Sequence, residues 1–207
     1  MARSGLFAAN LKCATLDEAD LAGAELVSAD LTASSMAYAN LEGADMSTAD
    51  LVGANLQDAN LSGAILEGAD LYCANLQGAN LRGANLRGAN LHNADLYCAC
   101  LVDADLTDTT LINTNLSFAE FGNTTLNWKS HDLMAELLFR NTGGKVDKVK
   151  FVGLVLLKRN WSWEDFLALN DPETEWALKT LSAYVKEGDS SPALLKAVAK
   201  EVVTTND

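Results

Sequence analysis

The chain has 207 residues and a net charge of −13, which suits one ordinary domain or two small ones. So large a negative charge argues against nucleic acid as a partner, because phosphate binding requires clustered lysine and arginine. No signal peptide is expected, because no apolar run follows Met1. No membrane partner is expected either, because the longest apolar run, residues 151–157, is far too short to span a bilayer. We therefore expect a soluble, cytoplasmic protein whose four cysteines are reduced thiols.

The charge is unevenly distributed along the chain. Residues 1–126 carry 16 acidic and 4 basic side chains, whereas residues 127–207 carry 12 and 11. Such different balances indicate two different structures. We place the first in residues 1–128 and the second in residues 129–207.

A five-residue repeat occupies the first of these units. Every fifth residue from Leu6 to Leu126 is leucine, except at Met36, Met46 and Phe121. Alanine stands two residues before this position in 20 of the 25 repeats, and Asp or Asn stands one before it in 16. Alternate side chains of an extended chain face the same way, so the leucine and alanine face inward and the Asp or Asn outward. The two remaining residues, the second often glycine, suit the corner of a type II turn.

This A-[DN]-L-x-x pattern resembles the pentapeptide-repeat family, over about 60% of the chain. The resemblance implies a right-handed quadrilateral β-helix with four repeats per coil. Residues 20 apart then lie above one another at the strand spacing of about 4.8 Å, and about six coils make a rod of roughly 30 Å. The expected fold is a mainly β solenoid followed by a small all-α domain.

Helix signals replace the repeat in the second unit. Ser130 is placed to cap a helix, and Asp171 and Ser191 each precede a proline at the first position of a helix. We expect four or five short helices, with Trp161, Trp163 and Trp176 in their core. A solenoid exposes unpaired backbone at its ends, so this domain is expected to cap the C-terminal coil. The expected joints are Phe118, Phe121 and Trp128.

No catalytic or cofactor motif is recognisable in the sequence. Cys98 and Cys100 should point outward at one corner with His92 nearby, but four-ligand zinc sites usually pair two such short motifs. A solenoid filled with leucine also leaves no room for a substrate pocket. We expect no catalysis, no cofactor and no metal site.

Two outward columns of the predicted solenoid are candidates for binding a partner. The first is acidic at its centre and reads Asn10, Asp30, Asp50, Asp70, Asn90, Thr110. Its aspartates either bond to the amides of neighbouring turns or form an acidic stripe that faces a basic partner. The second reads Lys12, Thr32, Val52, Tyr72, His92, Ile112, with Tyr97 on the next face. Its apolar part either marks an interface or is covered by the chain's own C-terminal helices.

These columns favour a non-catalytic interaction module that presents acidic and apolar walls to an unidentified protein partner. The candidate binding residues are Asp30, Asp50, Asp70, Val52, Tyr72, His92, Tyr97 and Ile112. The resemblance implies an alternative, since family members of the Qnr and MfpA type mimic duplex DNA and bind gyrase. Duplex DNA of about 30 Å carries about 18 phosphate charges, the same order as the charge of residues 1–126. An unidentified activity of the helical domain is a further alternative.

The first coil is a candidate for self-association. It should present an open strand edge together with Leu6 and Phe7, and such an edge pairs with another chain unless something blocks it. Lys12, Asp17 and Glu18 are the charges that could block it. A homodimer joined end to end through this coil would satisfy the edge.

Overall fold

The computed structural model describes residues 5–127, 130–148, 152, 166, 171–185 and 195–196. The chain separates into two compact units, Met1–Asn127 and Trp128–Asp207. The first is built from the pentapeptide repeats, and the described parts of the second contain helices. Within the described residues, no helix is long and apolar enough to cross a membrane.

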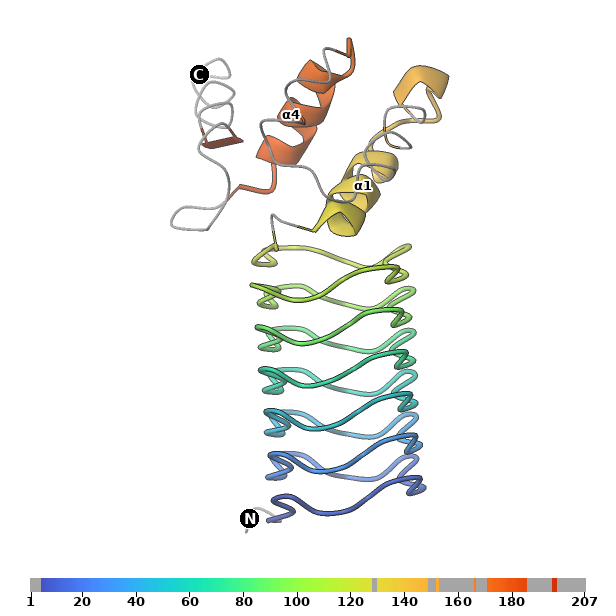
Figure 1. Cartoon of the computed structure of the whole chain (residues 1–207), viewed down its shortest axis with the longest axis vertical. Helices are drawn as coiled ribbons and strands as arrows, with labels where there is room; N and C mark the ends of the chain where they lie inside the picture. The colour runs from blue at the N-terminus through green and yellow to red at the C-terminus, as the bar shows by residue number, and fades with distance from the viewer. Residues whose placement is uncertain are drawn as a thin grey trace. The chain divides into compact units, whose positions relative to one another are not determined.

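The first unit is a β-helix whose coils are twenty residues long (Figure 1). Parallel bridges join each residue at every fifth position to the residue twenty positions later, from Gly5 with Glu25 to Asp105 with Thr125. Each coil therefore has four faces, as the repeat predicts. Each face contributes a single bridged residue, because the chain turns a corner before a longer strand can form.

Main-chain hydrogen bonds join neighbouring coils along every face. Around Asp70, for example, the N–H of Leu51 donates to the carbonyl of Asp70 over 2.7 Å, and the N–H of Asp70 donates to the carbonyl of Ala49 over 2.9 Å. A third bond runs between corners, from the N–H of Gly53 to the carbonyl of Tyr72. The bonds repeat from coil to coil, so side chains of one column keep the same surroundings through most of the solenoid.

Every corner is a turn closed by a hydrogen bond such as that from the N–H of Ala54 to the carbonyl of Leu51, at 3.0 Å. The second corner residue has a positive φ at all 24 corners from Ala8 to Asn123, eight of them glycine and sixteen not. This is the conformation of a type II turn that the sequence predicts. Because the corner side chain points outward, even Tyr38 and Phe118 occupy this position.

Leucine and alanine fill the interior of the solenoid. From Leu26 to Leu106 each residue at the central position of the repeat is fully buried. Where threonine replaces the inward alanine, its hydroxyl bonds to the main chain, as Thr124 does to the carbonyl of Leu101 over 2.6 Å. The core therefore contains stacked leucines flanked by small side chains.

Two helices of the second unit are described in full. Helix α1 spans His131–Arg140, and the hydroxyl of Ser130 accepts a bond from the N–H of Leu133, which confirms the predicted cap. Helix α4 spans Thr174–Ser182 and packs against α1 (Figure 1). It begins later than the Asp171-Pro172 signal predicts, because Asp171 closes a separate turn by accepting bonds from the N–H groups of Glu173 and Thr174.

Apolar side chains of both helices are buried, including Leu133, Leu137, Leu138, Ala177 and Leu181. Trp176 is half-buried, and the ammonium group of Lys148 lies 4.3 Å from the centroid of its ring. Most residues of the other predicted helices, together with Trp128, Trp161 and Trp163, lie outside the described residues.

Candidate functional site

The acidic column forms one face of the solenoid, which we call the Asp50 face. Parallel bridges place Asp50 between Asp30 and Asp70, one coil away on either side. In each of the three, Oδ1 accepts a hydrogen bond from the N–H two residues later, over 3.0 Å in Asp30 and 3.1 Å in the other two. The expected bonding of the aspartates to their own turns is therefore present, and it fixes three carboxylates in a row on the surface.

Neighbouring groups alter the charge properties of this face. The hydroxyl and N–H of Thr32 both donate to Asp30 and hold its pKa below the ordinary value of 3.8, and Lys12 lowers it further. Above them, the side-chain amide of Asn90 donates to Oδ1 of Asp70 over 2.9 Å. The position above the three carboxylates is therefore a neutral amide that bonds to Asp70, rather than a fourth carboxylate.

The apolar column forms the next corner, which we call the Tyr72 corner. The rings of Tyr72 and His92 contact each other one coil apart, with centroids 5.3 Å from each other and planes tilted by 31°. Ile112 follows one coil above and is 42% exposed, while Val52 is half-buried below. Four of the predicted binding residues therefore lie along one edge of the solenoid.

Tyr97 lies at the following corner, the Tyr97 corner, where it meets Phe118, which was not among the predicted binding residues. Its ring packs edge to face against that of Phe118, with centroids 5.5 Å apart. The side chain of Phe118 is 72% exposed at this corner of the solenoid. The signal was present in the sequence, because Phe118 is the second residue after a central leucine and such residues point outward.

A polar face separates these two corners. The carboxylate of Asp95 accepts bonds from the N–H of Tyr97 and the side-chain amides of Asn115 and Gln77. The amide of Asn75 donates to Asn55 in the same column over 3.0 Å. We call the five side chains Tyr72, His92, Ile112, Tyr97 and Phe118 the aromatic strip. It spans two corners of the solenoid on a hydrogen-bonded support.

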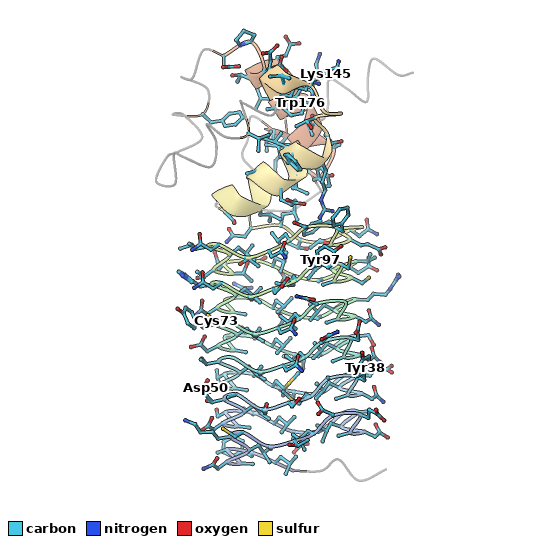
Figure 2. All side chains as sticks on the ribbon, turned by 90° about the vertical axis from the view of Figure 1, so that its right-hand side faces the viewer. Tyr38, Asp50, Cys73, Tyr97, Lys145 and Trp176 are labelled. Carbon is cyan, nitrogen blue, oxygen red and sulfur yellow. The ribbon has the colours of Figure 1, made fainter. Side chains whose placement is uncertain are left out.

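The four cysteines are free thiols. Cys73 belongs to the Tyr72 corner, and Figure 2 shows it on the same side of the solenoid as Asp50 and opposite Tyr38. A hydrogen bond with the exposed thiol of Cys98 raises the pKa of Tyr97 above its ordinary value of 10.0. Among the described residues, no three His, Cys, Asp or Glu side chains are grouped so that they could hold a metal ion.

The first coil differs from those above it. Its inward residues Leu6, Leu11, Leu16 and Leu21 are only half-buried, whereas Leu26 and its successors are fully buried. Phe7 is 71% exposed. Asp17, one of the three charges that could block the edge, accepts bonds from the hydroxyl of Ser35 and the N–H of Ala37 in the second coil.

The repeats also match a known family. The pentapeptide-repeat model matches residues 9–47, 49–88, 69–108 and 89–127, which is more than half of the chain. The chain belongs to the pentapeptide-repeat family, whose members are right-handed β-helices. No curated protein matches the sequence.

Several solved structures are similar to the solenoid. A pentapeptide repeat protein from the Arabidopsis thaliana thylakoid lumen is 37% identical, with a TM-score of 0.45 over 45% of this chain and 66% of that one. Rfr23, a pentapeptide repeat protein of the cyanobacterium Cyanothece 51142, is 46% identical, with a TM-score of 0.36 over 46% and 62%. QnrB1, a plasmid-mediated fluoroquinolone resistance protein, is 19% identical, with a TM-score of 0.35 over 55% and 70%. The chain thus spans less than two thirds of the first two proteins.

Proposed function

We propose that this chain is a non-catalytic interaction module whose solenoid presents the aromatic strip to a protein partner. The observation that carries the proposal is the exposure of Tyr72, Tyr97, Ile112 and Phe118 on a solenoid whose interior is already filled by leucine. These side chains are not needed to complete the core. Exposed apolar groups that lie together on a rigid support are typical of binding surfaces.

The architecture supports a binding role over a catalytic one. The side chains of the strip stand on walls whose main-chain groups bond to neighbouring coils, so the backbone that carries them is held in place. A preorganised surface loses little conformational entropy when a partner binds. The free thiols support a reducing compartment such as the cytoplasm.

Site-specific photo-crosslinking tests this proposal in living cells. A photoreactive phenylalanine analogue replaces Phe118 in one variant and Tyr38 in the other, because both are exposed at the second position of the same corner. We expect a discrete covalent adduct from position 118 and none of the same mass from position 38. Identical adducts at both positions, or none at position 118, would contradict the proposal.

A second candidate function rests on the Asp50 face. Residues 5–127 carry sixteen acidic and only three basic side chains, and Asp30, Asp50 and Asp70 form a fixed row of carboxylates. Such a row at a spacing of about 4.8 Å bears charge along its length as a nucleic-acid backbone does. This arrangement supports a DNA-mimicking role toward a gyrase-type topoisomerase as the alternative.

A further inference from the structure

The aromatic strip is flanked by charges of one sign. We propose that it binds a short cationic segment of another protein, one that also carries apolar side chains, rather than a second copy of this chain. This inference rests on the proposed interaction function and names the chemistry of the partner. The size of the strip and the charges around it carry the inference.

The strip has the dimensions of a peptide-binding site. Tyr72 and Ile112 lie two coils apart on one corner, a distance of about 10 Å at the spacing of β-strands. The face between the two corners is three residues wide, or about 7 Å along an extended chain. Two or three turns of an amphipathic helix, or a few extended residues, would cover such an area.

The aromatic strip alone is smaller than the interface of a stable dimer, so a dimer would also have to bury the acidic surface around it. Tyr72, Tyr97, Ile112 and Phe118 are 39%, 42%, 42% and 72% exposed. At about 200 Å² for each large side chain, this corresponds to roughly 400 Å² of accessible surface. A stable interface between folded proteins buries about 800 Å² on each partner. A short segment needs less area, because it can also bond to the polar groups beside the strip.

Carboxylates surround the strip. Asp95 lies between its two corners and Asp70 on the adjoining Asp50 face, while Asp58 lies below it on the Tyr97 corner and Glu120 on the face beyond. On these corners and faces of the described solenoid, the sole lysine or arginine is Lys12, three coils below Tyr72. Lysine or arginine side chains on a partner would therefore meet opposite charge around an apolar centre.

The same charges oppose pairing of two copies through their aromatic strips. Its arginines, Arg82 and Arg87, occupy the other two corners, and Arg82 is already paired with Asp103 over 2.9 Å. Two strips brought face to face would place their surrounding carboxylates against each other. Like charges in such a contact reduce affinity, so electrostatics selects a cationic partner.

A random peptide library displayed on phage tests the chemistry of the occupant without assuming a sequence. The full chain is the bait, and the selected 16-residue peptides are synthesised and measured by fluorescence anisotropy. We expect them to be rich in lysine or arginine together with aliphatic or aromatic residues. We also expect their affinity to fall as salt increases.

Two variants separate binding at the strip from general attraction to an acidic surface. The double variant Tyr97→Ser/Phe118→Ser should weaken peptide binding at least tenfold, whereas Tyr38→Ser, with the same net charge, should leave it unchanged. Thermal unfolding of both variants checks that the solenoid remains folded.

Three outcomes would overturn the inference. In the first, the selected peptides are neutral or acidic. In the second, the double variant and Tyr38→Ser weaken peptide binding equally. In the third, sedimentation shows a dimer of the chain that Phe118→Ser alone disrupts. Each is distinguishable from failure of the proposed function, because crosslinks from position 118 report a partner whatever its charge. If position 118 gives crosslinks but the selected peptides are not cationic, the proposed interaction function stands and the proposal of a cationic partner segment is wrong.

Discussion

The carboxylate of Asp58 occupies the space that a side chain at Gly78, one coil above, would need. A Cβ atom added to Gly78 overlaps Oδ1 of Asp58 and lies 3.2 Å from its Cγ. Gly83 has almost the same backbone, with a φ of +67° against +65°, but nothing within 4 Å of such a Cβ. Alanine at Gly83 would therefore meet only the strain of a left-handed backbone, whereas alanine at Gly78 would meet the same strain and a steric clash.

We expect Gly83→Ala to cost about 1 kcal/mol, because alanine in the left-handed region is strained. Gly78→Ala should cost about 1 kcal/mol more, since Asp58 must leave its preferred rotamer. Adding Asp58→Ala to Gly78→Ala should remove this extra cost. Thermal or urea unfolding measures all four proteins, and equal losses for the two single variants would show that Asp58 moves aside without penalty.

Leu81 and Arg82 are neighbours in sequence that should differ widely in their contribution to stability. Leu81 is fully buried, so Leu81→Ala should cost about 2–5 kcal/mol through the cavity it leaves. Arg82 forms an exposed ion pair with Asp103, so Arg82→Gln should cost less than about 1 kcal/mol. Urea unfolding followed by circular dichroism compares them, and similar losses would contradict the inward and outward assignment.

Thr32 should control the titration of Asp30. Because the folded pKa of Asp30 lies below the ordinary 3.8, its ionised form stabilises the fold above that pH, and this contribution disappears as pH falls through the folded pKa. Thr32→Val removes the hydroxyl bond but keeps the N–H bond, so the pKa should rise part of the way toward 3.8. NMR titration of the Asp30 carboxyl carbon measures the change, with Asp50 as the control. An unchanged pKa would show that the hydroxyl bond is not formed in solution.

The Asp50 face provides the test of DNA mimicry. If this alternative is correct, the protein inhibits gyrase supercoiling, and Asp30→Asn, Asp50→Asn and Asp70→Asn together remove the inhibition. Asparagine keeps a side-chain oxygen that can accept the bonds from the turns. The strip variant Tyr97→Ser/Phe118→Ser is the control and should retain any inhibition. If micromolar protein does not inhibit supercoiling, the DNA-mimicry alternative is contradicted and the interaction module remains the proposed function.

We further propose that the first described coil mediates self-association of the 207-residue chain, because Phe7 and the half-buried Leu6 present apolar surface there. Sedimentation should show a dimer at tens of micromolar, and Phe7→Lys should convert it to a monomer. Phe118→Lys, equally charged but far along the solenoid, is the control. A monomeric wild type would contradict this proposal.

The solenoid could be predicted because the same five-residue pattern recurs throughout its sequence and specifies the same local structure each time. One inward leucine in every five residues fixes the corners, and parallel pairing at a period of twenty then assigns each outward residue to a face. The same rule places Tyr38 and Phe118 on the surface, although both escaped the list of candidate binding residues. Phe118 belongs to the candidate site because its ring contacts that of Tyr97 one coil away, and this contact appears only when the chain is read in columns.

The helical unit was less predictable, because no repeat constrains it. Ser130 marked the start of α1 correctly, since a serine cap acts through a bond to an amide three residues away. The Asp171-Pro172 signal located a turn rather than the start of α4. Such local signals specify where the chain bends, while the packing of apolar side chains decides how far each helix continues.

Because each coil contains four repeats, the number of repeats between two surface residues determines the angle between them around the axis of the solenoid. Removal of one repeat between Asp50 and Tyr72 would leave the leucine interior intact but turn everything above the deletion by one face, about a quarter of a revolution. Removal of four repeats would keep every column straight and bring the two ends closer by about 4.8 Å. The number of repeats between two surface features, counted modulo four, therefore sets the angle between them, and the number of complete coils sets their separation.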